Sequence, residues 1–461
     1  MAQRWTRREV LTALSSLFAA PFLVGCGTAR TPSRLTPGTR VIVVGAGFAG
    51  LAAARRLTER GGEVLILEAR DRIGGRVHSV TRGGLTFDMG ASWIHGLTGN
   101  PMTGLTDELG LVRTTTDYEA RQDFAANGSE LTGDALEAAF ELLEAVAASI
   151  ESVADAEGPD RSLAEAVEEV VASMGLTAAQ RADLSYALHV MVEHEFAAPT
   201  TRLSARCFDE GAEQRGGDAI VGQGLMRIAE HLSDGLDVRL SRPVTRIEVG
   251  EDGVQVHSSD GVYEADRVVV AVPLGVLEAG AIVFSPPLSV MKSEALGKLA
   301  MGLLHKTWLR FATAFWRDVL DDPFMGFRDP QGRFAEWLNL DALLGVPVLC
   351  GFNAGPEGER LEGLSDETVV AQALAALRTI FGRQGIDVPE PTDALVSRWG
   401  VDPYALGAYS YLPVGACEED RAELARVEHG RVHFAGEHTS TASPATIHGA
   451  YLSGRRAADE V

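Results

Sequence analysis

Apolar runs and a helical pattern alternate between residues 41 and 68. Residues 41–44 are four consecutive β-branched residues, which is typical of a buried parallel strand. Apolar residues then recur at helical spacing over residues 51–60, and a second apolar run covers residues 63–68. The pattern predicts a strand, a helix and a second parallel strand that together form one βαβ unit.

Three segments beyond residue 97 have apolar residues at three- and four-residue spacing and are rich in Ala, Leu and Glu. They predict a helical insertion over residues 135–156, 162–174 and 177–195. Alternating segments then return, with Asp-Gly turns between several of them. We expect these segments to be strands that rejoin the first sheet: residues 236–240, 244–249, 254–257 and 268–272.

The chain leaves this sheet again after Pro287. The fold class that these patterns indicate is α/β, with a Rossmann-like dinucleotide-binding domain interleaved with an α+β substrate-binding domain of mixed sheet and helices. The first domain comprises residues 40–97, 203–288 and 396–461, and the second comprises residues 98–202 and 289–395. The later elements that we expect are helices at residues 293–301, 367–381 and 446–460 and strands at residues 305–311, 324–328, 335–339, 348–352 and 431–437.

Composition agrees with a globular chain of two domains. The 461 residues are 46% hydrophobic and 23% charged, and we find no internal run of about 18 apolar residues that would suggest a membrane span. The net charge is −23, and because the first 40 residues contain six arginines and one acid, the remainder carries −28. Such a body should repel nucleic acid and attract cations such as protonated amines, although solubility explains the charge equally well.

The four cysteines are widely scattered. Cys26, Cys207, Cys350 and Cys417 have neither the spacing of a zinc site nor that of a disulfide framework. We therefore expect no metal. A pairing among the last three cysteines stays open.

The first 40 residues resemble an export signal and a tether. The segment TRREVL at 6–11 resembles a twin-arginine signal, and a short apolar stretch follows it. The segment LVGC at 23–26 resembles a lipobox, which would make Cys26 a lipid anchor and residues 27–39 a linker. The alternative is an ordinary cleavable signal with an incidental cysteine. We expect a periplasmic or cell-envelope protein.

The first βαβ unit carries a glycine-rich turn. Gly45, Gly47 and Gly50 follow the first strand, and the second strand ends in Glu68. Glycines permit close backbone approach, amides at the start of the next helix can bind a pyrophosphate, and a carboxylate about 20 residues further on can bind ribose hydroxyls. A glycine triplet alone also occurs in ordinary turns, but the complete unit predicts a dinucleotide ligand.

Seven stretches from about residue 40 to residue 461 resemble, in consistent order, the flavin-containing amine oxidases. Within that family the chain looks most similar to the polyamine oxidase and lysine-specific demethylase branch. EARDRIGGRV at 68–77 adds to the likeness. The seven stretches are VIVVGAGFAG (41–50), MGASWIHG (89–96), RPVTRI (242–247), HKTW (305–308), WGVDP (399–403), GAYSY (407–411) and FAGEHT (434–439) through PATIHGA (444–450).

The resemblance implies FAD as the cofactor. It places Arg70 near the adenosine, Arg76 near the phosphates, Val244 beside the adenine and Glu437 near the ribityl chain and pyrophosphate. Ala408 stands where monoamine oxidases carry the cysteine that bonds to the flavin, so we expect the FAD to be non-covalent. The other cofactor-binding residues that the resemblance implies are Gly75, Gly90, Ala91, Ser92, Trp93, Trp399, Gly436, Thr446 and Ile447.

Thr446 and Ile447 resemble the start of a helix beneath the flavin ring. The positive end of a helix dipole aimed at the ring would stabilise negative charge as the flavin is reduced. The alternative is a C-terminal helix that is merely packed on the sheet. Thr446 also stands where monoamine oxidases place a second aromatic residue, so we expect a more open site that admits longer amines.

Lys306 is the main catalytic candidate. It shares a predicted strand face with Leu304 and Trp308, and a lysine that points into such a core is costly unless it is paired. The resemblance implies that this lysine holds a water against flavin N5, whereas a solvent-facing lysine is the ordinary alternative. Trp399 and Tyr409 resemble the aromatic residues that line the substrate side of the flavin, although either could simply fill the core.

Glu195 and His95 are the substrate-binding candidates. Glu195 matches a carboxylate that polyamine oxidases use against a distal ammonium, and His95 occupies another substrate-facing position. A carboxylate there would favour a dication over a simple amine through Coulomb attraction. Glutamates at helix ends are also common on surfaces.

The expected reaction is oxidation of an amine C–N bond, with O2 reduced to H2O2 and the amine converted to an imine and then an aldehyde. An L-amino-acid oxidase or a monoamine oxidase on the same fold is an alternative. The former often has an arginine near residues 90–93, and this chain has none between Gly90 and Gly96. Histone demethylation is disfavoured by the export signal, and a flavin-binding envelope protein without turnover is the alternative from another class.

Overall fold

The computed structural model describes residues 34–154, 158–209, 211–212 and 214–461. The predicted export signal and Cys26 lie outside these residues. Within the described ranges, no helix has both the length and the apolar character needed to cross a bilayer.

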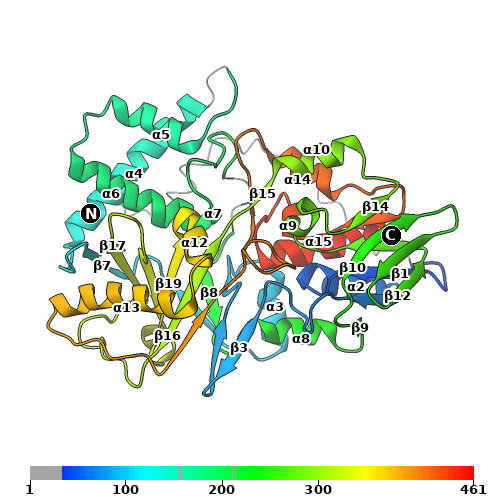
Figure 1. The fold of residues 1–461 in the computed structure, drawn as a ribbon, viewed down its shortest axis with the longest axis horizontal. Helices are drawn as coiled ribbons and strands as arrows, with labels where there is room; N and C mark the ends of the chain where they lie inside the picture. The colour runs from blue at the N-terminus through cyan, green and yellow to red at the C-terminus, as the bar shows by residue number, and fades with distance from the viewer. Residues whose placement is uncertain (1–33, 155–157, 210, 213) are drawn as a thin grey trace.

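The first sheet is parallel throughout, with the strand order β22-β13-β1-β2-β9. Because β1 is central, its β-branched residues are buried on both faces. Val41 and Val43 pack against helices, including α2 and α15, which lie side by side in Figure 1, whereas Ile42 and Val44 face a second sheet. The elements are β1 (Arg40–Val44), α2 (Phe48–Glu59), β2 (Glu63–Leu67), α8 (Met226–Ser233), β9 (Asp237–Arg239), β13 (Arg267–Val270), β22 (Val432–Phe434) and α15 (Ile447–Glu460).

The second sheet corrects one expectation. Only β9 and β13 rejoin the parallel sheet, whereas the other expected strands form a separate sheet of order β12-β11-β10-β14. Its antiparallel strands bury Ile247, Val254 and Val256 against the face of β1 that the helices leave free. The elements are β10 (Val244–Val249), β11 (Val254–Ser258), β12 (Gly261–Ala265), α9 (Leu274–Glu278), β14 (Val283–Ser285) and α10 (Val290–Lys298).

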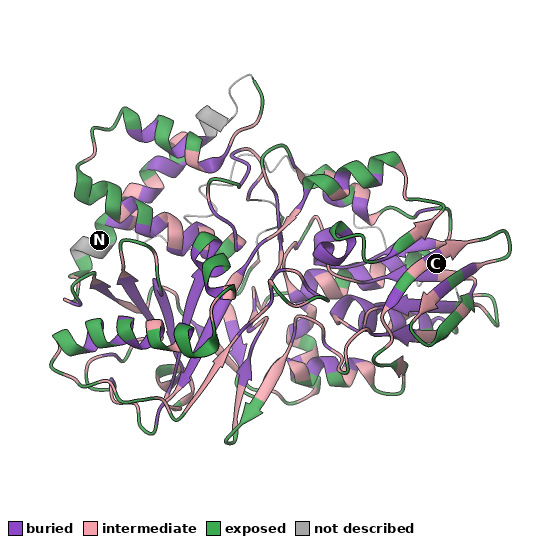
Figure 2. Cartoon of the chain, in the orientation of Figure 1, coloured by how far each residue is buried: buried purple, intermediate pink, exposed green. Residues whose placement is uncertain are grey.

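The largest sheet is mixed and has the order β20-β16-β19-β18-β17-β7. Helix α13 covers it with a buried inner side and an exposed outer side (Figure 2). Strand β7 lies in a region where we expected the pattern to change directly to helices. Its alternation is hidden by Arg121 and Asp123, which are polar but buried. The elements are β7 (Arg121–Ala125), β16 (Leu304–Arg310), β17 (Phe324–Arg328), β18 (Glu336–Asn339), α11 (Leu340–Leu344), β19 (Val348–Ala354), α12 (Gly355–Glu362), α13 (Asp366–Arg383) and β20 (Asp393–Val396).

The helical insertion contains α4 (Gly133–Ala154), α5 (Leu163–Ala172) and α6 (Ala178–Leu188). Ser162 and Thr177 begin α5 and α6 with capping boxes, which explains the clear starts of these helices. The single helix expected over residues 177–195 is interrupted by a π-helix, His189–Glu193, before the short α7 (His194–Phe196). Ala197 then ends it in the left-handed conformation.

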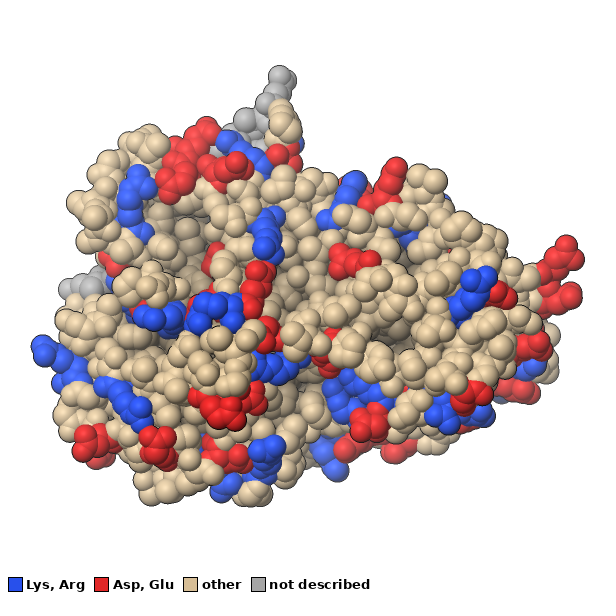
Figure 3. Space-filling model, in the orientation of Figure 1, with Lys and Arg blue, Asp and Glu red and all other residues tan. Residues whose placement is uncertain are grey.

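Smaller elements connect these sheets. They are β3 (Ser79–Arg82) with β4 (Leu85–Asp88); β5 (Trp93–Ile94), β8 (Asp218–Val221) and β6 (Arg113–Thr116); β15 (Ala300–Met301) with β21 (Ser410–Tyr411); and the helices α3 (Pro101–Glu108), α14 (Glu418–Ala425) and the 3-10 turn Glu437–Thr439. On the surface in Figure 3, acidic and basic side chains are interspersed.

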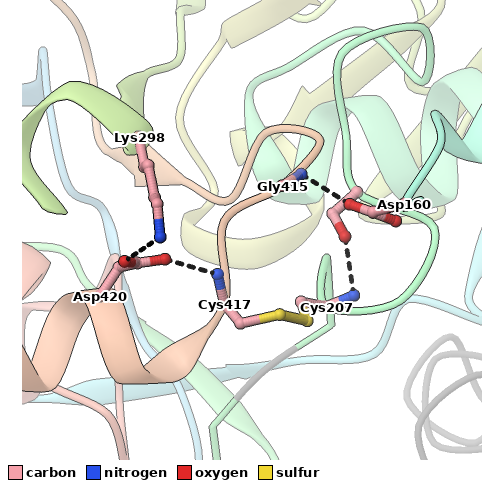
Figure 4. Close-up of a disulfide and its surroundings, with 7 residues drawn as sticks. Asp160, Cys207, Lys298, Gly415, Cys417 and Asp420 are labelled. Carbon is pink, nitrogen blue, oxygen red and sulfur yellow. Dashed lines mark hydrogen bonds and ion pairs between the residues drawn. A yellow bond between two sulfur atoms is a disulfide. The ribbon is translucent and has the colours of Figure 1, made fainter. Parts of the chain in front are cut away.

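A disulfide joins Cys207 to Cys417, which answers the question of pairing that the sequence left open. The third of these cysteines, Cys350, is free and buried. Figure 4 shows Asp420 beside the bond, accepting from the Cys417 backbone amide at 3.1 Å and pairing with Lys298 at 2.9 Å. The bond therefore ties the loop after the helical insertion to the start of α14.

Candidate active site

A cavity of about 930 Å³ is lined by residues of both the parallel sheet and the large mixed sheet. Gly50 is the one residue among the sequence-predicted site residues that does not line it. The predicted residues that do are Gly45, Gly47, Glu68, Arg70, Gly75, Arg76, Gly90, Ala91, Ser92, Trp93, His95, Glu195, Val244, Lys306, Trp399, Tyr409, Gly436, Glu437, Thr446 and Ile447.

The glycine turn after β1 allows two close backbone approaches and leaves one open space. A side chain at Gly45, whose φ is +102°, would place its Cβ 2.7 Å from the carbonyl oxygen of Ala271, and one at Gly50 would collide with the carbonyl of Gly45. By contrast, nothing lies within 4 Å of the Cβ position of Gly47. Within the described part of the chain no side chain caps the start of α2, so its first amides remain for an anion.

Glu68 and Arg70 are held at the end of β2. The Glu68 carboxylate accepts from the backbone amides of Ala46 at 2.7 Å and Arg70 at 2.8 Å. The Arg70 guanidinium pairs with Asp402 at 2.7 Å and lies 5.5 Å from the centre of the Tyr404 ring. These contacts fix a carboxylate and a guanidinium in the cavity wall.

Arg76 and Glu437 form a second fixed ion pair, with 2.8 Å between Nη1 and Oε1. The other carboxylate oxygen of Glu437 accepts from Ser410 Oγ at 2.6 Å and from the Ala445 amide at 3.1 Å. Burial alone would raise the pKa of Glu437, but Arg76 and other neighbouring groups lower it to about 2. Glu437 is therefore an anion that stabilises Arg76 at the cavity.

Thr446 begins α15. Its hydroxyl accepts from the Gly449 amide at 3.0 Å, and both Thr446 and Ile447 line the cavity. The positive end of the helix dipole is therefore at the cavity wall, where it favours negative charge.

Lys306 is 4% exposed and lies in β16. Its Nζ donates to the Gly90 carbonyl at 2.5 Å, to Ser92 Oγ at 2.6 Å and to the Asp88 carbonyl at 3.4 Å. Burial lowers the pKa of Lys306, although Cys350 and Asp88 act in the opposite direction. The lysine thus points inward, its ammonium donates three hydrogen bonds, and the lowered pKa makes it easier for this group to release a proton.

The aromatic candidates are oriented by hydrogen bonds. Trp399 Nε1 donates to the Met89 carbonyl at 2.8 Å, and the Tyr409 hydroxyl donates to the His194 carbonyl at 2.8 Å. Trp93 donates to Thr116 at 3.2 Å. With their polar atoms engaged, these rings present apolar surface to the cavity.

His95 and Glu195 differ in their settings. The Nδ1 of His95 lies 2.8 Å from Asp218, which also accepts from the hydroxyl of Tyr118 at 3.1 Å. Glu195 is exposed, although it lines the cavity. The candidate distal carboxylate therefore lies where solvent screens its charge.

Glu336 is a buried carboxylate of the cavity that the sequence analysis did not identify. It is 4% exposed and lies on the same cross-strand row as Lys306, because Phe352 of β19 pairs with Lys306 on one side and with Glu336 on the other. Glu336 belongs to the strand expected at residues 335–339. A single acid in an apolar strand was the only signal for it.

Comparison with known proteins identifies the family. The model of the flavin containing amine oxidoreductases matches residues 48–461. The chain belongs to this family. It is therefore an oxidoreductase that acts on CH–NH groups, and membership implies FAD as the cofactor.

This amine oxidoreductase is similar to proteins of two named activities. It is 35% identical to polyamine oxidase 2 of Arabidopsis thaliana, covering 91% of this chain and 87% of that protein. It is also 35% identical to lysine-specific histone demethylase 1 homolog 1 of Oryza sativa subsp. japonica, where the match covers 96% of this chain but 54% of the relative. A solved structure of putrescine oxidase bound to putrescine shares the fold, with a TM-score of 0.72 at 23% identity, over 92% of this chain and 99% of that one.

The residues of this amine oxidoreductase fit FAD. The open space at Gly47 and the uncapped start of α2 suit a pyrophosphate, Glu68 suits ribose hydroxyls, and Arg76 suits a phosphate. The start of α15 would lie against the flavin ring. When bound, FAD supplies the acceptor for the hydride equivalent of the amine.

Proposed function

We propose that this amine oxidoreductase is an oxidase of polyamines or related diamines. The amine is oxidised to an imine, which hydrolyses to an aldehyde and an amine, and O2 is reduced to H2O2. The protein residues exclude water, orient the amine and control its protonation. Lys306, Trp399 and Tyr409 act at the reacting end, and a carboxylate binds the second ammonium.

The row formed by Lys306, Phe352 and Glu336 carries this proposal. Residues directly opposite each other on antiparallel strands share a face, so all three side chains are on the cavity side of the sheet. Two strand spacings separate the backbones of Lys306 and Glu336 by about 10 Å. A buried anion therefore lies along the cavity wall from the lysine, where a second ammonium can be bound.

Other charges support a cationic substrate. Besides Glu336, the cavity lining includes Asp117, Glu119, Glu195, Asp209 and Asp218. The lining also includes the cations Arg70, Arg76, Arg242, Lys306 and Arg421, but its carboxylates outnumber them, and an excess of negative charge attracts cations. Similarity to polyamine oxidases points the same way.

Non-covalent FAD is part of the proposal. Ala408 lines the cavity and offers no sulfur, and none of the described cavity residues is a cysteine. We expect acid precipitation or denaturation to release all the flavin. Flavin that stays with the precipitated protein would contradict this point.

Anaerobic flavin bleaching tests the substrate class. We expect putrescine, spermidine or spermine to reduce the flavin faster than n-butylamine, aromatic monoamines or L-amino acids. Peroxide formation on admission of O2 then tests the acceptor. Faster reduction by L-amino acids or monoamines would replace the proposal with one of those activities, and a flavin that no amine bleaches would indicate a binding protein.

Glu336→Gln, with Glu195→Gln as its matched comparison, tests which carboxylate binds the distal ammonium. We expect Glu336→Gln to raise KM for putrescine about tenfold and KM for n-butylamine much less, because a buried charge is screened less than an exposed one. If only Glu195→Gln has the selective effect, Glu195 is the anchor. Equal effects on both amines would contradict the role of either residue.

Export to the cell envelope is also proposed. The Cys207–Cys417 bond supports it, because disulfides persist mainly in oxidising compartments. Cell fractionation of the full chain and of Cys26→Ser tests it. Lipid anchoring predicts that only the serine variant is released from membranes, whereas a simple cleavable signal predicts that both are soluble.

A further inference from the structure

Helix α14 is anchored at both ends and carries a buried arginine between them. The Cys207–Cys417 disulfide fixes its start (Figure 4), and at its end the Lys292 ammonium of α10 donates to the carbonyl of Leu424 at 2.7 Å. Arg421 of this helix is 1% exposed and lines the cavity. A buried guanidinium is costly unless it is hydrogen-bonded, and the sequence motifs of the family do not include this residue.

Arg421 contacts a hydroxyl of the cavity wall. Its Nη1 donates to Ser410 Oγ at 2.6 Å and, at the longer distance of 3.5 Å, to the carbonyl of His438. A guanidinium has donors only, so the Ser410 oxygen must accept. The single hydrogen of the hydroxyl is then left for Glu437 Oε2, which is 2.6 Å away. Arg421 therefore sets the direction in which Ser410 donates.

The same carboxylate holds Arg76. Glu437 Oε1 accepts from Arg76 Nη1 at 2.8 Å, and this nitrogen also donates to the Ala408 carbonyl at 3.0 Å. Among the residues that the structure describes, both hydrogen bonds of Arg76 use Nη1, so the donors on Nε and Nη2 remain for the cavity that the side chain lines. Guanidinium donors of this kind suit the oxygens of a phosphate.

We infer that Arg421 is a positioning residue for FAD: it orients the Ser410 hydroxyl toward Glu437, which in turn holds Arg76 in place for the pyrophosphate. This inference rests on the non-covalent FAD of the proposed function, but it does not depend on which amine is oxidised. Loss of Arg421 should weaken the binding of FAD and leave the choice of amine unchanged.

Arg421→Met removes the guanidinium and keeps an unbranched side chain. The dissociation constant of FAD is measured on apoprotein, from the change in flavin fluorescence on binding. We expect Kd to rise about tenfold, as for loss of one hydrogen bond in a network with a charged group. With FAD saturating, the ratio of KM for putrescine to KM for n-butylamine should stay within about twofold of the wild type. An unchanged Kd would overturn the inference.

Ser410→Ala tests whether Arg421 acts through this hydroxyl, and it carries the test by itself if Arg421→Met does not fold. We expect Ser410→Ala to raise Kd for FAD about tenfold. The double variant should bind FAD no more weakly than either single variant, because both changes break the same series of hydrogen bonds. Effects that add would mean that Arg421 contacts FAD directly and would overturn its positioning role.

Lys292→Met is the matched control for the order of α14. It removes another buried cation that is bonded to this helix, but Lys292 is not among the residues that line the cavity. We expect a lower melting temperature of the apoprotein and a change of less than about twofold in Kd for FAD. An equal loss of FAD affinity in Lys292→Met and Arg421→Met would mean that FAD depends only on the general order of α14, which would overturn the specific role.

The outcomes distinguish the inference from the proposed function. If acid releases the flavin of the wild type and Arg421→Met and Ser410→Ala both bind FAD as tightly as the wild type, the inference is wrong and the non-covalent cofactor stands. Flavin that stays attached to the wild type would overturn both, because a covalent cofactor cannot be released through loss of Arg421. A changed amine preference with an unchanged Kd for FAD would overturn the inference alone.

Discussion

Replacing Cys207 and Cys417 with serine measures how much one bond between distant segments stabilises this protein. The two cysteines are 210 residues apart in sequence. In the chain-entropy model, opening a loop of this length adds unfolded-state entropy that destabilises the fold by about 5 kcal/mol at 25 °C. The native segments remain joined by other contacts, such as the Ser204 amide bonded to the Leu412 carbonyl at 3.0 Å. The loss should therefore come mainly from the unfolded chain.

Denaturant unfolding of the oxidised wild type and of the double serine variant tests this reasoning. Two interleaved sheet regions can unfold in separate steps, so the midpoint of each transition is compared. We expect the double serine variant to have a lower midpoint, which corresponds to a loss of about 2–5 kcal/mol in the free energy of unfolding. FAD should stay bound at denaturant concentrations below the transition. Cys350→Ala controls for the loss of a buried thiol and should lower the free energy of unfolding by about 1 kcal/mol. Equal midpoints, with thiol titration confirming that the wild-type bond is closed, would refute the entropic argument.

The remaining predictions concern two buried residues of β16. Lys306→Met should retain FAD while slowing flavin reduction or reoxidation about 100-fold or more, because a buried proton-exchanging group is lost; unchanged steady-state and rapid kinetics would remove Lys306 from the mechanism. Burial lowers the pKa of His305 to about 3 in the folded protein, from about 6.5 in the unfolded chain. Between these two values the unfolded chain binds a proton at His305 and the folded protein does not, so stability should fall as pH decreases from about 6.5. In unfolding measured at several pH values, His305→Leu should reduce the change in the free energy of unfolding by about 1.4 kcal/mol per pH unit. Asp88 acts in the opposite direction at pH 5 to 6, because burial raises its pKa to about 6. The same pH dependence in the variant and the wild type at about pH 5 to 6 would contradict the assignment to His305.

The sequence by itself determined the features that depend on neighbouring residues. Four β-branched residues, a glycine turn and an acid define the first βαβ unit, and the structure has it at β1, α2 and β2. Two-residue alternation placed Lys306 on one strand face with Leu304 and Trp308, and the resemblance to the amine oxidases favoured an inward lysine, which is buried and paired in the structure. Spacing within a strand or helix is fixed by local geometry, so these conclusions needed no knowledge of the partner strand.

Only the tertiary structure decided which distant residues meet. The strand that contains Glu336 was expected, but its position opposite Phe352, and hence on the row of Lys306, depends on the register between β18 and β19. Tertiary packing also decided that β7 pairs with β17, because the polar side chains of Arg121 and Asp123 concealed this strand in the sequence. It likewise decided that Cys207 meets Cys417. A shift of one residue in register turns every side chain of a strand to the other face, and that choice is made by packing across the whole sheet.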